Sequence, residues 1–284
     1  MCPTFASLSG ESDEEDKLYL TKGRQLTKLA LDHAVPIIFA PRFGQAFVQR
    51  HDGSVERITV PPPTPDQIES ATGCLLQLRN EYFLVTAEHV LDKYQERRDN
   101  GESLVWQVGE VPFDPLPCVA WRGSRKRTRK DIVFLRLSEQ EAREACGDQA
   151  HIISAANAWP PSAPKEDELV LLAGYLNRIK EVENDTITPR PLSAMLKVTR
   201  STGDGTFKCR YESSDITSFA PEALPLEDLR GNTGGVSGGP VFRIEDSSDP
   251  FVFVGVMSEV GGGTVDDADT VVIDAVDGVP SKFS

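Results

Sequence analysis

The segment Gly231-Asn232-Thr233-Gly234-Gly235-Val236-Ser237-Gly238-Gly239-Pro240 decides how the rest of the chain is interpreted, because it surrounds one serine with glycines. Glycine adopts positive φ and lets the backbone approach other groups closely, so this run suits a tight turn that presents amide N–H groups around the Ser237 hydroxyl. Amides that converge beside a hydroxyl form an oxyanion site. Taken alone, the segment fits a glycine-rich hairpin turn or a linker with a chance serine equally well.

A serine hydroxyl is a weak nucleophile that needs a base, and the base needs an orienting acid. Every histidine of the chain precedes Ser237: His33, His51, His89 and His151. A Gly-x-Ser-x-Gly pattern can mark the nucleophile elbow of an α/β-hydrolase, but that fold requires a histidine after the serine. The order of the residues therefore excludes an α/β-hydrolase. His51 and His151 lie in polar segments, and we expect both at the surface.

His89 is the strongest candidate base. It lies in Tyr82-Phe83-Leu84-Val85-Thr86-Ala87-Glu88-His89-Val90-Leu91, an apolar, β-rich run that brings an imidazole to the end of a strand. Asp131 opens Asp131-Ile132-Val133-Phe134-Leu135-Arg136-Leu137, a short apolar run that predicts a buried strand. Burial suits an aspartate that holds an imidazole. The order along the chain is therefore His, Asp, Ser.

At this point the sequence resembles the chymotrypsin-like (trypsin-fold) serine proteases, and their bacterial, intracellular or HtrA-like branches more than the secreted digestive enzymes. The resemblance rests on four blocks in the family's order, within residues 70 to 261. They are Thr86-Ala87-Glu88-His89-Val90, Asp131-Ile132-Val133-Phe134-Leu135, Gly235-Val236-Ser237-Gly238-Gly239-Pro240 and the weaker Val254-Gly255-Val256-Met257-Ser258. Each block is short, and their joint occurrence in this order carries the resemblance.

The resemblance implies two β-barrels, with His89 and Asp131 in the first lobe and Ser237 in the second. It implies a serine endopeptidase in which His89 is the base, Asp131 orients it and Ser237 forms an acyl-enzyme. The oxyanion hole would be the N–H groups of Gly235 and Ser237.

The resemblance also implies a substrate pocket and shows two departures from the family. Gly231 would form the pocket floor, and the wall would include Ser258, Glu259 and Val260. Val236 stands where zymogen-type relatives have an aspartate that pairs with a new N-terminus, so we expect no such activation. Glu88 stands where the family has a small residue, and we expect its side chain to face solvent.

The pattern of many short strands and few helices independently predicts an all-β sandwich or barrel. With the resemblance, this becomes a two-lobed double β-barrel with a short N-terminal helix. We expect an acidic leader and helix in residues 1–34, a first lobe in 35–160 and a second lobe in 161–284. A basic cluster between Arg122 and Lys130 fits a solvated loop, or a docking site for an acidic partner.

The composition narrows the classes of partner. The chain has 284 residues, a net charge of -14 and a pI near 4.8, which argues against nucleic-acid or anionic-membrane binding. The N-terminal sequence lacks a signal-peptide pattern, so we expect a cytoplasmic protein. The five cysteines are widely spread, which predicts free thiols and neither a disulfide framework nor a zinc site. We expect no metal and no cofactor.

The leading interpretation is therefore a serine endopeptidase that acts on a protein or peptide substrate. The alternative is a protease-fold binding or adaptor protein, whose cleft stays inactive until a regulatory protein partner orders the oxyanion loop.

Overall fold

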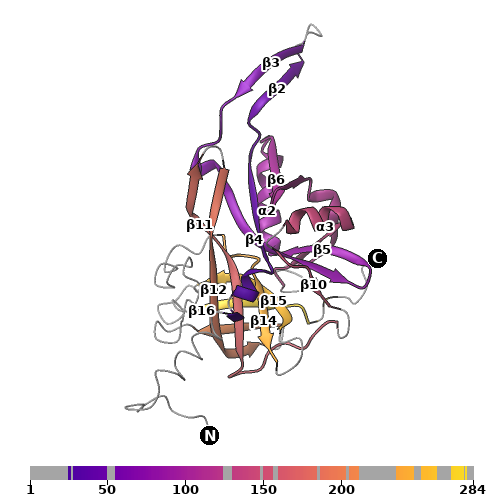
Figure 1. The fold of residues 1–284 in the computed structure, drawn as a ribbon, viewed down its shortest axis with the longest axis vertical. Coiled ribbons are helices and arrows are strands. Elements are labelled where there is room, and N and C mark those ends of the chain that lie inside the picture. The colour runs from indigo at the N-terminus through magenta and orange to yellow at the C-terminus, as the bar shows by residue number, and fades with distance from the viewer. Residues whose placement is uncertain are drawn as a thin grey trace.

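The computed structural model describes residues 25–26, 28–49, 55–123, 130–147, 150–155, 159–183, 186–202, 205–210, 235–245, 251–260, 270–277 and 279. Within these, the backbone alone is described for 45–49, 55–58, 177–183, 186–190 and 259–260. Strands dominate, in an open sheet and a closed barrel (Figure 1).

The open sheet forms the first half of the molecule. Its strand order is β7-β6-β1-β4-β5-β9-β8, with β10 pairing to β4 in addition. The strands are β1 (Ala34–Pro41), β4 (Glu69–Leu78), β5 (Glu81–Thr86), β6 (Leu104–Val108), β7 (Val111–Phe113), β8 (Val119–Arg122), β9 (Val133–Leu137) and β10 (Ile153–Ser154). In the described residues β7 and β8 are the open edges, so this sheet is a half-barrel.

The closed barrel forms the second half. Its six strands pair in the order β11-β12-β13-β16-β15-β14. They are β11 (Leu169–Glu183), β12 (Thr186–Thr202), β13 (Thr206–Arg210), β14 (Pro240–Ile244), β15 (Phe251–Val260) and β16 (Thr270–Ala275). The β11–β12 hairpin is the longest pairing, and Figure 1 shows β11 rising from the barrel towards the sheet.

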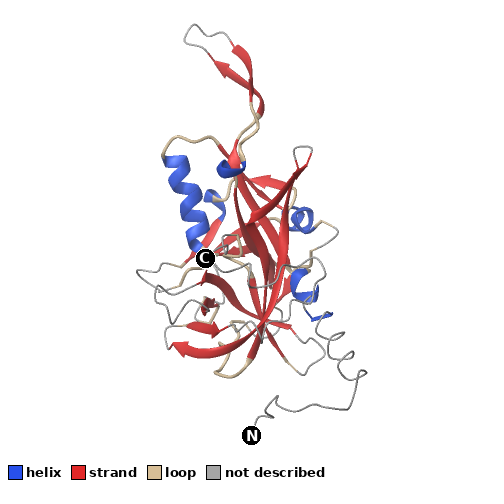
Figure 2. Cartoon of the chain, turned by 90° about the vertical axis from the view of Figure 1, so that its left-hand side faces the viewer, coloured by secondary structure: helices blue, strands red, loops and turns tan. Residues whose placement is uncertain are grey.

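Two of the described helices, which Figure 2 draws in blue with the other helical segments, pack on the open sheet. Helix α2 (Glu88–Asp99) follows β5 directly, and α3 (Glu139–Cys146) follows β9. Helix α3 starts at a capping box in which Ser138 and Glu141 exchange hydrogen bonds. Two 3-10 turns, η1 (Pro65–Gln67) and η2 (Leu116–Cys118), complete the helical content of the named elements.

A third strand pair extends away from the body. Strand β2 (Gly44–Gln49) pairs with β3 (Val55–Val60) as a separate two-stranded sheet. Figures 1 and 2 show this hairpin projecting beyond the open sheet.

A single hydrophobic cluster joins the sheet to the barrel. On the sheet side it contains Phe83 and Phe134, and on the barrel side Phe242 and Phe253, all nearly inaccessible to solvent. Phe134 packs edge-on against Phe83 at a centroid distance of 6.1 Å, and Trp159 lies against both Phe134 and Phe253. Because buried apolar area holds the two halves together, they pack as one unit.

The predicted all-β class and its two-lobed arrangement are confirmed. The predicted helix is present where the structure describes it, in residues 25–26 and 28–31, and Leu26 and Leu31 pack against the shared cluster. The sequence patterns missed β3, β7, β8, β10, β14 and β16, which are short or lie in polar segments. In the described residues no helix is long and apolar enough to cross a membrane.

We predict that Phe134→Ala lowers the free energy of unfolding by about 3–5 kcal/mol, because it leaves a cavity in the cluster shared by both halves. Phe43→Ala is the matched control, because Phe43 is 53% exposed and its loss should cost less than about 0.5 kcal/mol. Urea unfolding measures both. Equal stabilities of the two variants would contradict the packing described here.

Candidate active site

His89 and Asp131 are in direct contact. His89 Nδ1 lies 2.6 Å from Asp131 Oδ2, and the backbone N–H of His89 donates to Asp131 Oδ1 over 2.8 Å. A carboxylate only accepts hydrogen bonds, so Nδ1 carries a proton, and in the neutral ring Nε2 is then the nitrogen with the lone pair. The His89 side chain is 41% exposed and that of Asp131 is 1% exposed. The aspartate is therefore held inside while the imidazole reaches the surface.

Helix α2 places His89. Strand β5 ends at Thr86, Ala87 is the residue before the helix, and His89 sits in its first turn. The sequence placed this imidazole at a strand end. The chain instead turns into the helix, which aims the backbone N–H of His89 at Asp131. Two hydrogen bonds then fix the residue.

Lys130, next to Asp131, is buried and bonds to the closed barrel. Its ammonium donates to the Ala275 carbonyl over 2.6 Å and pairs with Asp277 Oδ1 at 2.9 Å. Reading the basic cluster as a solvated loop is wrong for Lys130, because its charge is satisfied inside the protein. Residues 124–129 of the cluster lie outside the described residues.

The expectation that Glu88 faces solvent is also wrong. Glu88 is buried and accepts a hydrogen bond from Arg122 Nε over 2.9 Å. Arg122 also pairs with Asp92 on the same helix. A buried carboxylate needs a partner, and the guanidinium supplies it.

The turn that carries Ser237 packs against the start of α2. Gly238 has φ +85°, and a Cβ there would collide with Thr86 Oγ1 and the Thr72 carbonyl and come within 2.8 Å of the Ala87 nitrogen. Only glycine fits this close approach at positive φ. Ser237 is thus brought beside the residues that lead directly into His89.

Thr72 on β4 holds this turn. Its backbone N–H donates to the Ser237 carbonyl over 3.0 Å, and its hydroxyl donates to the Gly235 carbonyl over 2.6 Å. The Thr72 oxygens in turn accept from the Thr86 hydroxyl at 2.7 Å and from the Tyr175 N–H at 2.9 Å. We call this four-bond arrangement the Thr72 brace. It connects β4, β5, β11 and the Ser237 turn.

The backbone amides of the turn divide into two groups. Those of Gly238 and Gly239 donate to the carbonyls of Met257 and Val236. Those of Gly235 and Ser237 make no hydrogen bond within the described part of the chain, and Gly235 has φ +102°. Two amides in the same turn thus remain available to an outside acceptor.

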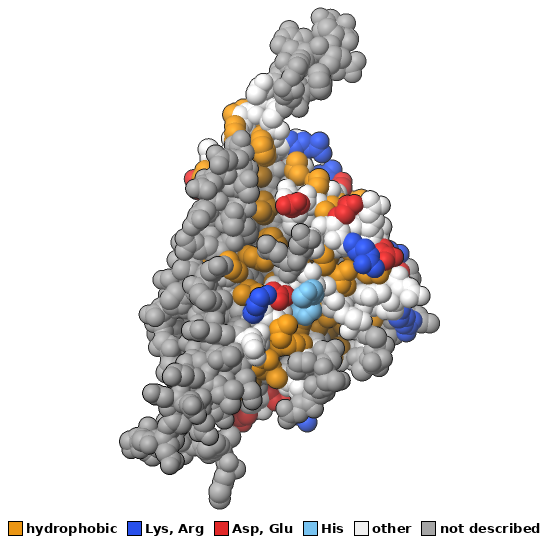
Figure 3. Space-filling model, viewed as in Figure 1, with side chains coloured by type: hydrophobic (Ala, Val, Ile, Leu, Met, Phe, Trp, Pro, Cys, Tyr) orange, Lys and Arg blue, Asp and Glu red, His pale blue; other side chains and the backbone are white. Residues whose placement is uncertain are grey.

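Ser237 and His89 are both described, and among the described hydrogen bonds none joins the Ser237 hydroxyl to the imidazole. Ser237 is half-buried. Figure 3 draws the face of the molecule opposite helix α2, which lies on the far side in the view of Figure 1.

The residues predicted for the substrate pocket are only partly described. Gly231 lies outside the described residues, and for Glu259 and Val260 the structure gives the backbone alone, in β15. Ser258 is buried, and its hydroxyl lies 3.2 Å from the Val272 carbonyl. It therefore contacts the neighbouring strand β16.

Sequence reasoning missed Asp274, a buried carboxylate on β16. It accepts hydrogen bonds from the Ser258 side chain and the Asp131 backbone. Burial is the main cause that raises the pKa of Asp274 from 3.8 to about 6, and the nearby Asp131 charge adds to it. Asp274 lies in the tail of the chain and outside every motif, so only the fold brings it to the site.

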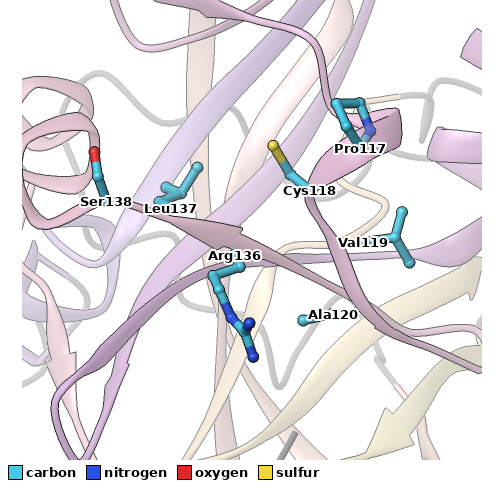
Figure 4. Close-up of a pocket in the computed structure, with 7 residues that line it drawn as sticks. All are labelled: Pro117, Cys118, Val119, Ala120, Arg136, Leu137 and Ser138. Atoms are coloured by element: carbon cyan, nitrogen blue, oxygen red, sulfur yellow. The ribbon is translucent and has the colours of Figure 1, made fainter. Parts of the chain in front are cut away.

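The described residues contain no cluster of three or more His, Cys, Asp or Glu side chains that could hold a metal ion. A pocket of about 410 Å³ lies between η2, β8 and β9 (Figure 4). Its lining residues are Pro117, Cys118, Val119, Ala120, Arg136, Leu137 and Ser138. None of these is a predicted catalytic or substrate-binding residue.

Comparison with known proteins gives weak likenesses. No protein-family model matches the sequence, and no curated protein matches it either. Solved structures with a similar fold include a thermostable serine protease, AL20, from an extremophilic microorganism, at 12% identity over 87% of this chain and 92% of that one, with a TM-score of 0.42.

Two further similar structures are the scabies mite inactivated protease paralogue S-D1 and human heparin binding protein. The first has 12% identity over 88% of this chain and 89% of that one, with a TM-score of 0.43. The second has 12% identity over 89% of this chain and 87% of that one, with a TM-score of 0.39. A serine protease and an inactivated protease paralogue are thus both among the similar structures.

We predict that Gly238→Ala destabilises the protein by about 3 kcal/mol or more, since strain at positive φ adds to overpacking against Thr86. Gly101→Ala is the control, because Gly101 has φ +90° with open space where a Cβ would lie and should cost only about 1–2 kcal/mol. Urea unfolding compares the two. Equal costs would show that the turn does not pack against α2 as described.

Proposed function

We propose that this protein is a serine endopeptidase that uses Ser237, His89 and Asp131 to hydrolyse peptide bonds through an acyl-enzyme. The observation that carries the proposal is the double contact of Asp131 with His89, 2.6 Å to the ring and 2.8 Å to the backbone. A buried carboxylate that fixes an exposed imidazole is the arrangement that general-base catalysis requires.

The reaction follows from the proposed roles. Ser237 Oγ attacks the carbonyl carbon of the substrate while His89 Nε2 takes the hydroxyl proton. Asp131 holds the ring and stabilises the imidazolium that forms. His89 then gives the proton to the leaving amine, which releases the first product and leaves the acyl group on Ser237. A water molecule, activated by His89 in the same way, releases the acid.

The amides of Gly235 and Ser237 would bind the oxyanion. This role is supported because the two amides make no hydrogen bond in the described part of the chain. The amides of Gly238 and Gly239, by contrast, already donate to backbone carbonyls. Preorganised amides stabilise the negative charge of the tetrahedral intermediate, and one such donor contributes about 10²–10³-fold to turnover.

Activation by a new N-terminus is not part of the proposal. Val236 is 1% exposed and packs inside the barrel core, against Gly174. An ammonium placed there would be buried without a partner, at a cost of several kcal/mol. We propose that substrate, the N-terminal segment or a protein partner supplies any ordering of the oxyanion loop.

The second candidate is a protease-fold binding protein. It is favoured by one observation, namely that no hydrogen bond joins the described side chains of Ser237 and His89. Catalytic hydrogen bonds are often long in free enzymes and shorten when substrate binds, so this observation does not outweigh the His89–Asp131 contact.

We predict that a fluorophosphonate labels Ser237 and no other serine, because Ser237 is the proposed nucleophile with His89 as its base and lies in a turn with two unbonded amides. Peptide mapping by mass spectrometry locates the label. Ser237→Ala and His89→Ala should abolish labelling, while Ser103→Ala, which changes an exposed serine, should keep it. Labelling that survives in His89→Ala would contradict the proposed triad, and a wild type that is never labelled would favour the binding protein.

We predict that Asp131→Asn keeps the fold and lowers turnover by about 10⁴-fold, since the amide favours the wrong imidazole tautomer. Asp99→Asn is the control, because Asp99 is exposed at the end of α2 and its change should leave turnover within about twofold. Hydrolysis of a peptide library gives the rates. Full activity of Asp131→Asn would contradict the role given to this carboxylate.

A further inference from the structure

Asp274 lies next to Asp131, on the other half of the molecule. It is 4% exposed, in β16, where its backbone faces Val256 of β15 and Thr206 of β13. Its carboxylate accepts the backbone N–H of Asp131 and a hydrogen bond from Ser258. Its Oδ1 is buried and has no hydrogen-bond partner in the described part of the chain.

The Ser258 hydroxyl has one proton and two acceptors within reach, the Val272 carbonyl at 3.2 Å and the Asp274 carboxylate. It donates to one at a time, and a charged carboxylate is the stronger acceptor. Ser258 therefore favours the charged form of Asp274, as does the N–H of Asp131.

The ionisable groups that face Asp274 come from the segment before β9. Asp131 opposes the charge on Asp274, and Lys130 favours it. The Lys130 ammonium, however, donates to the Ala275 carbonyl at 2.6 Å and to Asp277 at 2.9 Å. Among the side chains of strand β15 that the structure describes, Ser258 contributes a hydroxyl. Asp274 is therefore a weakly compensated buried carboxylate next to the Asp131 carboxylate.

A purely structural role does not explain why this residue is an acid. Asparagine has the same shape and could accept the same two hydrogen bonds without burying a charge. Burying a charge beside another charge of the same sign lowers stability. The carboxylate of Asp274 differs from an asparagine amide in that it adds a negative charge next to Asp131.

We propose that Asp274 is a positioning residue for the triad, which holds the Asp131 backbone and adds a second negative charge that favours the imidazolium form of His89. This inference rests on the proposed function. In the reaction His89 becomes positively charged when it takes the Ser237 proton, so a second carboxylate stabilises that step. Asp274 acts through Asp131 and does not touch the substrate.

The first test is the NMR titration of the His89 imidazole, with Ser237→Ala as background so that the chain cannot digest itself. In Asp274→Asn the titration midpoint of His89 should fall by about 0.5–1 pH unit, because a negative charge is lost. The wild-type carboxylate should also broaden the His89 curve, since two coupled groups titrate together. Asp167→Asn is the control, because Asp167 is exposed on the barrel surface and should leave the curve unchanged.

The second test is thermal stability against pH. The folded state raises the pKa of Asp274 from 3.8 to about 6, so it binds the proton more tightly than the unfolded state does. The contribution of Asp274 to the free energy of unfolding of the wild type should therefore fall as the pH rises from about 4 to 6. Asp274→Asn should melt roughly 5 °C higher than wild type at pH 7.5, with the difference shrinking towards pH 4.

A residue with only a structural role would give the opposite pattern. Asp274→Asn would then melt lower than wild type and leave the His89 midpoint unmoved, and that result would overturn the inference. Asp274→Thr, which keeps an acceptor for the Asp131 N–H without charge, should move the midpoint in the same direction as asparagine. Opposite effects of the two variants would also overturn it.

A third measurement, the rate of fluorophosphonate labelling as the pH is lowered, links the inference to the proposed function. With fluorophosphonate, Asp274→Asn should be labelled about tenfold more slowly than wild type at pH 7.5 and should lose labelling at a lower pH. If wild type is never labelled, the proposed function fails, while the His89 titration and the melting curves still decide the role of Asp274.

Discussion

The Thr72 brace is the interaction on which the site depends, because it joins the Ser237 turn of the barrel to the sheet that carries His89. Thr72 uses its N–H, its carbonyl and its hydroxyl, and three of its four bonds are 2.9 Å or shorter. Each bond is buried or partly buried, so its loss would leave polar groups unsatisfied. The hydroxyl bond to Gly235 also fixes the peptide beside the proposed oxyanion amides.

A second set of contacts holds the acid. Lys130 and Asp131 reach from the sheet into the end of the barrel, where Ala275, Asp277 and Asp274 receive them. Thr72 precedes His89 in the sequence and Lys130 follows it, and the shared aromatic cluster fills the space between the two halves. The proposed triad therefore forms only when the open sheet and the closed barrel pack together, because neither half alone contains all three residues.

Local patterns in the sequence were enough to predict the all-β class, the strands that precede His89 and follow Asp131, and the candidate residues, because short apolar runs and glycine turns are local signals. The His89–Asp131 contact exists in the structure, while the catalytic roles stay predictions. Thr72, Lys130 and Asp274 could not be found this way, because their partners are far along the chain. Thr72 and Gly235 are 163 residues apart, and Lys130 and Ala275 are 145 apart. No spacing or periodicity reports such contacts, and a lysine in a basic run looks solvated until its partners are known.

The central claim is that Ser237, His89 and Asp131 act together to form a covalent acyl-enzyme. The most direct measurement is intact mass spectrometry of protein quenched in acid within milliseconds of mixing with an activated ester. The account predicts a mass increase of one acyl group, mapped to Ser237, that builds up faster than the steady rate of hydrolysis and is absent in Ser237→Ala and His89→Ala. Hydrolysis of the ester without any acylated Ser237, or acylation that does not need His89, would contradict it.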